Sequence, residues 1–389
     1  MQIHPRFRYV LARLATIHLV PLRKRIGPTK ISMKTNLSFT PSKPAYLFLA
    51  AAIAATPLYA LKYAEPGPRV ALDKSLPEWK PGPHKVEPEE EFNLVGADTM
   101  DEMTLDWVKH FRKAYPKLSV TMEARASGTG IFALVDGKAH LAPVAREPLP
   151  AEAEAFRKKF GYDVFAIRVA TGAVASLGKT ATSLFFVHKD NPIAKTGLTF
   201  AQLDAIYSKT RKLGHTDIKT WGDVGATGEW KDRPIKLYGL RAPNGIEQFL
   251  KFEVLQGGDW KDSIAQTKGQ GPVHAFTVMA NEIATKEKGG IGYGLLDTLT
   301  PDVRVVPIAA APGKPFLTPT HANVLDHSYP LSRYVYVYAN RKPGQPLDPK
   351  VKEFLTMILS RQGQQAVADD RVFLPLPPEV LRAELKKLE

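Results

Sequence analysis

The 389-residue chain contains no cysteine, which excludes disulfide bridges, thiolate metal sites and a cysteine nucleophile. It also excludes a lipid-modified N-terminal cysteine, so an exported form would be free of a lipid anchor. None of the ten histidines has an HExxH or other paired metal-binding spacing. There is no GxSxG nucleophile elbow, and Ala173 replaces the first glycine of a P-loop before Gly178-Lys179-Thr180. These absences favour a protein that is not an enzyme and that needs neither a metal nor a cofactor.

Acidic residues are missing from the first 60 positions, which contain nine Lys or Arg residues. The whole chain has a net charge of +14, but the rest of the chain carries only about +5, with both signs interspersed. Aromatic residues are not interleaved with basic ones. This pattern does not indicate nucleic-acid binding, whereas a mild positive charge suits a small anionic ligand.

Residues 33–60 are typical of a secretory signal, with Met33-Lys34 at its basic start. The apolar run 45–55 is short for a membrane span, and small residues between Ala54 and Leu61 offer cleavage sites. We therefore expect a soluble periplasmic protein; the alternative is an N-terminal membrane anchor. Residues 61–91, with six prolines before position 91, are expected to form a linker after the N-terminal extension 1–60.

Two strand-to-helix turns carry the polar residues of most interest. The turn Ser127-Gly128-Thr129-Gly130 lies between an alternating apolar strand over 118–123 and a helix predicted from Ile131. The N-terminus of a helix attracts anions, glycine permits close approach, and the two hydroxyls can donate hydrogen bonds. The alternative interpretation is an ordinary helix cap made by Ser127 or Thr129. The turn at Asp98-Thr99, after a strand over 92–96, is of the same kind, and either residue is a natural N-cap.

Strands and helices alternate along the rest of the chain, which predicts an α/β fold with parallel βαβ units. Arg146 follows the third strand, and Arg241 ends a later strand just before a helix. The expected strands cover 139–144, 163–170, 183–188, 235–240, 290–294, 303–308 and 333–338. The expected helices cover 150–160, 246–255, 273–286, 348–360 and 361–368, with a further helix capped by Thr199.

Residues 92–389 resemble the phosphate-binding proteins of periplasmic ABC importers. The resemblance depends on short motifs in a shared order, and no single one of them is specific. They are Gly96-Ala97-Asp98-Thr99-Met100, Ser127-Gly128-Thr129-Gly130, Lys189-Asp190-Asn191-Pro192, Trp221-Gly222-Asp223, Arg241, Tyr329-Pro330-Leu331-Ser332-Arg333, and Phe354-Leu355 through Ser360-Gln362-Gly363-Gln364.

The resemblance implies a type II periplasmic-binding-protein fold: two α/β domains joined by two hinge strands, with the ligand in the cleft between them. The first domain would comprise 92–182 and 330–389, the second 183–329, with strands 183–188 and 333–338 as crossovers. The protein would be a monomer that captures phosphate or a related oxyanion for an ABC transporter permease. The implied ligand-binding residues are Asp98, Thr99, Ser127, Gly128 and Thr129 from the first domain, and Arg241 from the second.

Two departures from the family pattern affect the expected site. Gly245-Ile246-Glu247 stands where the family has Ser-Gly-Thr, and Arg146 stands where one family member has an acid that accepts the ligand's proton. Glu247 would either repel a dianion or turn back to pair with Arg241 or Arg146. The second functional hypothesis is therefore an exported sensor or interaction protein with altered or weak anion binding.

Overall fold

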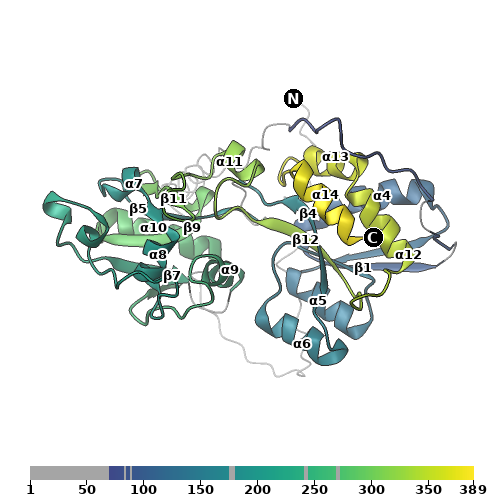
Figure 1. Ribbon diagram of the computed structural model, residues 1–389, viewed down its shortest axis with the longest axis horizontal. Coiled ribbons are helices and arrows are strands. Elements are labelled where there is room, and N and C mark those ends of the chain that lie inside the picture. Colours follow the sequence, from purple (N-terminus) through teal and green to yellow (C-terminus); the bar gives the residue numbers. More distant parts are fainter. Residues whose placement is uncertain (1–69, 83–84, 88–89, 175–179, 241–243, 269–271) are drawn as a thin grey trace, which may run out of the picture. The chain divides into compact units, whose positions relative to one another are not determined.

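The computed structural model describes residues 70–82, 85–87, 90–174, 180–240, 244–268 and 272–389. Its strands form two five-stranded sheets, with orders β2-β1-β3-β12-β4 and β10-β5-β9-β7-β8 (Figure 1). A two-stranded pair, β6 (Leu198–Thr199) with β11 (Ile308–Ala309), is separate from both. The chain is therefore a mixed α/β protein with two sheets.

The first sheet is covered by helices on both faces. Apolar side chains of β1 alternate in direction, so that Phe92 and Leu94 are buried on the face covered by α4, α12, α13 and α14. The other face packs against α5 and α6 (Figure 1). The elements are β1 (Glu91–Gly96), η1 (Asp98–Met100), α4 (Asp101–Ala114), β2 (Ser119–Ala124), α5 (Ser127–Asp136), β3 (Leu141–Val144), α6 (Pro150–Phe160), β4 (Phe165–Thr171), β12 (Tyr334–Ala339), α12 (Pro349–Ile358), α13 (Arg361–Asp370) and α14 (Pro378–Lys387).

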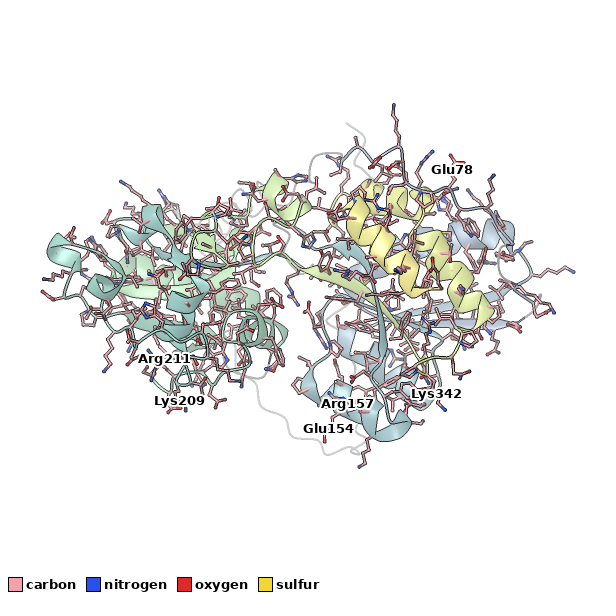
Figure 2. All side chains as sticks on the ribbon, in the orientation of Figure 1. Glu78, Glu154, Arg157, Lys209, Arg211 and Lys342 are labelled. Atoms are coloured by element: carbon pink, nitrogen blue, oxygen red, sulfur yellow. The ribbon has the colours of Figure 1, made fainter. Side chains whose placement is uncertain are left out.

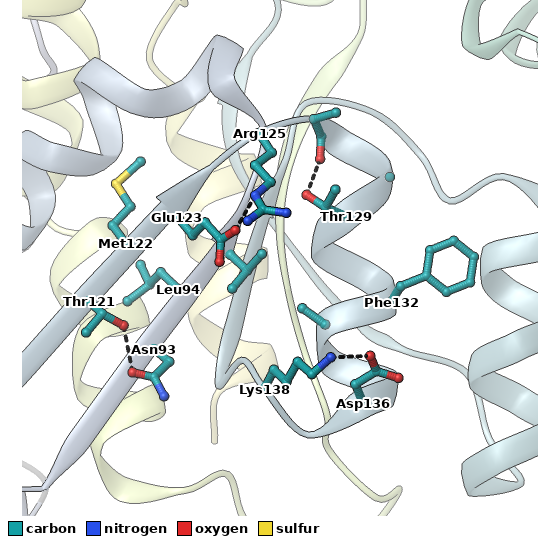
Figure 3. A pocket seen from close by; sticks show the side chains of 14 residues that line it. Asn93, Leu94, Thr121, Met122, Glu123, Arg125, Thr129, Phe132, Asp136 and Lys138 are labelled. Atoms are coloured by element: carbon teal, nitrogen blue, oxygen red, sulfur yellow. Dashed lines mark hydrogen bonds and ion pairs between the residues drawn. The ribbon is translucent and has the colours of Figure 1, made fainter. Parts of the chain in front are cut away.

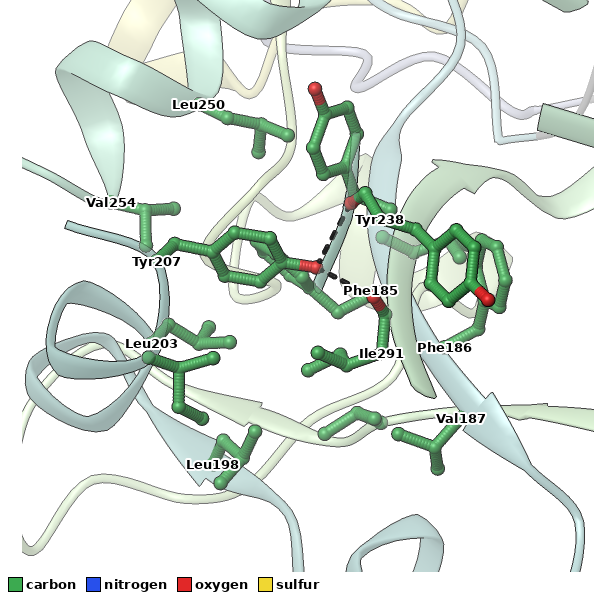
Figure 4. Packing of buried hydrophobic residues seen from close by; sticks show 14 of the residues in the cluster. Phe185, Phe186, Val187, Leu198, Leu203, Tyr207, Tyr238, Leu250, Val254 and Ile291 are labelled. Carbon is green, nitrogen blue, oxygen red and sulfur yellow. Dashed lines mark hydrogen bonds between the residues drawn. The ribbon is translucent and has the colours of Figure 1, made fainter. Parts of the chain in front are cut away.

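The second sheet has a continuous apolar core around its central strands. All six residues of β5 are buried, as expected for a strand that is covered on both faces. The Tyr207 hydroxyl lies inside this core and bonds to the carbonyl oxygens of Ile291 (3.0 Å) and Tyr238 (3.3 Å) (Figure 4). The elements are β5 (Ser183–His188), α7 (Ile193–Thr196), α8 (Phe200–Tyr207), η2 (Trp221–Val224), η3 (Gly228–Trp230), β7 (Lys236–Leu240), α9 (Gly245–Glu253), β8 (Ala265–Thr267), α10 (Pro272–Thr285), β9 (Gly290–Leu295), η4 (Leu296–Thr298), β10 (Val303–Val305) and α11 (His321–Leu325).

The predicted parallel βαβ units are only part of each sheet. Strand β1 pairs in parallel with β2 and β3, and β7 pairs in parallel with β8 and β9. Strands β12 and β5, however, run antiparallel to their neighbours. Both sheets are mixed because these two strands follow the long crossovers between the sheets, so each enters its sheet from the opposite direction.

The two crossovers are hydrogen-bonded to each other. The Gly172 amide donates to the Arg333 carbonyl at 2.8 Å, and the Tyr329 hydroxyl donates to the Ser183 carbonyl at 3.2 Å. A Cβ atom on Gly172 would lie only 2.5 Å from the Thr180 carbonyl oxygen. Glycine is therefore required there for the backbones to approach. The domain limits expected from the sequence remain a prediction.

Residues 70–82 form an N-terminal arm that packs on the first sheet's helices. Leu76 is buried, and the Trp79 indole N–H donates to the buried carboxylate of Glu353 at 2.9 Å. The Trp79 ring stacks on Phe111 with centroids 5.9 Å apart. Arg361 fastens the arm by donating to the carbonyl oxygens of Lys74 and Leu76 and by pairing with Glu78. Part of the segment predicted as a linker is thus packed structure.

Charged residues of both signs lie together on the surface (Figure 2). Glu154 and Arg157, on the outer side of α6, are exposed, and Arg157 pairs with Asp163 at 2.9 Å. Lys209 pairs with Asp262 in the same way at 2.8 Å. Pairs of this kind offset one another's charge locally.

His327 lies in the crossover that leads to β12. Its ring stacks on Tyr334 with centroids 3.9 Å apart, and its Nε2 atom lies 2.8 Å from the Thr171 hydroxyl. Burial, with a contribution from the Arg168 cation, lowers the pKa of His327 to about 4, against smaller opposing effects of Asp326 and Glu379. The histidine is therefore neutral at pH 7.

Replacing the arm's tryptophan tests how much the arm stabilises the fold. We expect Trp79→Ala to lower the free energy of unfolding by about 2–3 kcal/mol, because it removes an aromatic contact and one donor of a buried carboxylate. Lys80→Ala, which changes an exposed neighbour, should alter it by less than about 0.5 kcal/mol. Urea unfolding of both variants measures this, and equal stabilities would show that the arm contributes nothing.

The neutral histidine predicts a loss of stability in acid. Because the pKa of His327 is lower in the folded chain than its ordinary value of about 6.5, its contribution is complete above pH 6.5 and is lost as the pH falls towards 4. After a discount for solvent screening, we expect a loss of about 2 kcal/mol. His327→Asn, which tolerates the positive φ of 57°, should flatten the pH dependence of unfolding, whereas His215→Asn should not. Parallel curves for wild type and His327→Asn would contradict this.

Candidate functional site

The N-terminus of α5 has no side-chain cap. Its N-cap residue, Ala126, is extended and has no polar side chain, so the first amides of the helix are not bonded by a capping group. The Thr129 hydroxyl donates to the Ala126 carbonyl at 2.7 Å, and the Thr129 amide donates to the same atom at 2.9 Å. Ser127 and Gly128 therefore present their N–H groups at the positive end of the helix, where a negative charge is stabilised.

Arg146, which follows β3, is held in a two-pronged ion pair. Its Nη1 and Nη2 atoms donate to the two carboxylate oxygens of Glu152 at 2.8 and 2.7 Å, and Nη1 also donates to the Glu147 carbonyl at 2.9 Å. The Glu152 and Arg146 side chains are only 4% and 15% exposed. The Leu149 amide also donates to Glu152, at 2.8 Å. This arrangement fixes the guanidinium and offsets most of its charge.

The starts of two helices lie against this ion pair. A Cβ atom on Gly128, in the first turn of α5, would lie 3.2 Å from Glu152 Oε1 and 3.7 Å from Arg146 Nη2. A Cβ atom on Gly245, the first residue of α9, would lie 3.1 Å from Arg146 Cδ. A side chain at position 128 would push the ion pair aside, so the glycine keeps the helix start close to Arg146.

The N-terminus of α9 differs from that of α5 because it is capped by its own chain. The Asn244 side-chain oxygen accepts the amides of Ile246 (3.1 Å) and Glu247 (2.8 Å). Glu247 is 6% exposed. Burial raises the pKa of its carboxyl group, while the nearby Trp260 indole and Lys251 oppose this shift. Burial is thus the main influence on this carboxyl group, with one aromatic donor and one lysine nearby.

The structure resolves one alternative considered for Glu247. Arg146 is paired with Glu152, and within the described residues Glu247 forms no ion pair with it. Arg241, the other partner considered, lies outside the described residues. Whether Glu247 faces a bound ligand stays a prediction.

Asp98 and Thr99 lie at the same edge of the first sheet as α5. Strands β1 and β2 are parallel and end opposite each other, with Gly96 paired to Ala124, so the turns that follow them are neighbours. The expected helix cap at Asp98 or Thr99 is wrong: Asp98–Met100 form a 3₁₀ turn, and the N-cap of α4 is Met100, without a side-chain hydrogen bond. The chain enters α4 through a continuous tighter turn, which leaves no separate capping position.

Three residues near the site were not found from the sequence. Glu152, on α6, stands three residues after Leu149 at a helix start, where an acid is common. Asn244 precedes a glycine at a helix start, which is an N-cap signal. Arg333, 5% exposed, pairs with Glu147 at 2.9 Å, and its guanidinium lies 4.5 Å from the Phe249 ring centroid. No local pattern around Arg333 reveals this last contact, because its partners are distant in sequence.

A groove of about 740 Å³ runs from the start of α5 along β1 and β2 (Figure 3). Its polar side chains are occupied with one another: the Thr121 hydroxyl donates to Asn93, Lys138 pairs with Asp136, and Arg125 pairs with Glu123. The groove therefore offers few free charges to an anion away from α5. Among the residues that the structure describes, no group of His, Asp and Glu could hold a metal ion.

Sequence comparisons relate this chain to known binding proteins. Residues 83–362 match the PBP superfamily domain. The chain is 36% identical over 319 residues to a phosphate-binding protein PstS of Pseudomonas aeruginosa, covering 82% of this chain and 92% of that protein. It is 26% identical over 305 residues to a phosphate-binding protein PstS of Staphylococcus haemolyticus, covering 78% and 86%. The crystal structure of PstS from Borrelia burgdorferi aligns with a TM-score of 0.47 and 16% identity, covering 74% of this chain and all of that one.

Removing Glu152 tests the central ion pair. We expect Glu152→Ala to lower the free energy of unfolding by about 3 kcal/mol, because it leaves a largely buried guanidinium and the Leu149 amide unpaired. Glu154→Ala, on the exposed side of the same helix, is the matched control. Replacing both partners, with Arg146→Met and Glu152→Met, should cost less than Glu152→Ala alone. A double variant that is no more stable than the single one would contradict the pairing.

Proposed function

This chain belongs to the PBP superfamily, among the PstS phosphate-binding proteins, and from that membership we propose that it captures inorganic phosphate for an ABC importer. It is a binding protein with the two-domain type II fold, not an enzyme. Capture would use hydrogen bonds and electrostatic attraction, without a metal or a cofactor. The family binds its ligand between domains that close around it, and closure removes the ligand from water.

The observation that carries the proposal is the uncapped start of α5 beside Arg146. A tetrahedral oxyanion needs several convergent donors, and the amides of Ser127 and Gly128, the Ser127 hydroxyl and the positive helix end supply them. Arg146 is held in a fixed position by Glu152, which offsets most of its charge, so it shapes the site rather than adding net positive charge. The proposed ligand-binding residues are Asp98, Thr99, Ser127, Gly128, Thr129, Arg146, Arg241, Gly245 and Glu247.

Three of these residues have distinct proposed roles. Asp98, which is exposed at the edge of the first sheet, can accept the proton of hydrogen phosphate. The Arg241 guanidinium can grip two ligand oxygens at once. Glu247, whose pKa is raised by burial, would oppose a dianion less when protonated, so affinity would increase at lower pH.

The proposal includes export to the periplasm and delivery to a membrane permease. The charged and apolar pattern of residues 33–60 supports cleavage between Ala54 and Leu61. Among the described residues, no helix combines the length and the apolar character that a bilayer span needs. The segment expected to act as a signal lies outside those residues.

A second candidate function is an exported sensor or interaction protein with weak anion binding. The specific observation in its favour is Glu247, a buried carboxylate at the start of α9. Each unit of like charge at about 5 Å costs on the order of 3 kcal/mol at an effective dielectric of 20. Affinity therefore separates the two candidates.

Calorimetry on residues 61–389 with phosphate, arsenate and sulfate tests the proposal. We expect phosphate and arsenate to bind and sulfate to bind more weakly, because sulfate has no proton for a carboxylate to accept. Ser127→Ala should weaken phosphate binding about 10-fold or more, since a hydrogen bond to a charged group contributes about 1.5–3 kcal/mol. Ser119→Ala, at the exposed start of β2, the strand that precedes α5, should leave binding unchanged. Failure to bind phosphate at millimolar concentration would favour the sensor.

A further inference from the structure

We propose that Asn244 withholds the first amides of α9 from the ligand and thereby sets the affinity of the site. This inference rests on the proposed function and deepens it, because it says which half of the site does the binding. In this role Asn244 competes with the oxyanion for the same amide N–H groups.

The Asn244 side-chain oxygen accepts from the helix amides as a ligand oxygen would. Asn244 Oδ1 accepts from both Ile246 and Glu247, at 3.1 and 2.8 Å. The early amides of a helix are the donors that an anion uses when a helix end binds it. A side-chain oxygen bonded to two of them occupies that position, and an anion gains these bonds only by displacing it.

The cap lies at the site rather than at a remote helix end. Gly245, between Asn244 and the capped amides, packs against the Cδ and Nε atoms of Arg146, within 3.1 and 3.7 Å of an added Cβ. Gly128 of α5 approaches the same guanidinium from another helix. Two helix starts thus meet at one arginine, one uncapped and one capped.

The contrast between the two helices is a property of their N-cap residues. Ala126 has no side-chain acceptor, so only backbone atoms or a bound ligand can accept from the early amides of α5. Asn244 has an acceptor of the right length, and asparagine is among the strongest helix caps. The chain therefore presents the amides of α5 to the ligand and keeps those of α9 occupied.

Two substitutions at position 244 separate the roles of the side chain. Asn244→Gly removes the acceptor with the least cost to the helix, because glycine is itself a fair N-cap. Asn244→Asp keeps the acceptor and adds a negative charge beside the site. Thr199→Gly is the matched control. Thr199 caps α8, which packs on the same sheet as α9, by accepting from the Gln202 amide at 3.2 Å.

Calorimetric titration measures the phosphate affinity of each variant, and a thermal melt checks that the variant is folded. We expect Asn244→Gly to bind phosphate at least 5-fold more tightly than wild type, Asn244→Asp to bind at least 10-fold more weakly, and Thr199→Gly to stay within 2-fold. In amide NMR spectra, phosphate should shift the Ile246 signal in Asn244→Gly more than in wild type.

Equal or weaker binding by Asn244→Gly, in a variant that melts near the wild-type temperature, would overturn the inference and leave phosphate binding intact. If wild type and all variants fold yet none binds phosphate, the proposed function itself is wrong. The two failures are therefore distinguished by the wild-type titration.

Discussion

The buried pair of Arg146 and Glu152 is the interaction on which the site depends. A guanidinium that is mostly removed from water is tolerated only when a carboxylate matches its two donors, and Glu152 does so from the start of α6. The pair limits where α5 can lie, because a Cβ atom on Gly128 would lie 3.2 Å from Glu152 Oε1 and would displace that side chain slightly. The open end of α5 has a separate cause, the apolar N-cap residue Ala126.

The chain passes from one sheet to the other just before each of the antiparallel strands β5 and β12. Each follows a crossover, and the crossovers bond to each other through Gly172 and through Tyr329. Backbone atoms approach so closely at Gly172 that a larger residue there would disrupt the contact between the crossovers.

Local patterns in the sequence predicted most of the strands and helices, whereas the ligand-binding residues stay a prediction. The apolar run 183–188 is β5, and the predicted cap Thr199 accepts from the Gln202 amide at the start of α8. The helix α5 begins at Ser127 rather than Ile131, because the polar turn is itself its first turn. Helix α14 was missed because its apolar residues are sparse and its docking depends on Glu384, which is buried against Arg168 from a distant strand. The same limit applies to Glu152 and Arg333: a residue's charge is visible in a sequence, but the partner that buries it is not.

The N-terminal arm has a consequence for the order in which the chain can fold during synthesis. Trp79 bonds to Gln362, 283 residues later, and β12, which lies between β3 and β4, is also contributed by the last sixth of the chain. The first sheet therefore lacks an interior strand and the arm lacks its partners until the ribosome has made almost the whole protein. The second sheet, whose strands all lie between residues 183 and 305, can form earlier, so the two sheets are completed in the reverse of the order in which the chain enters them.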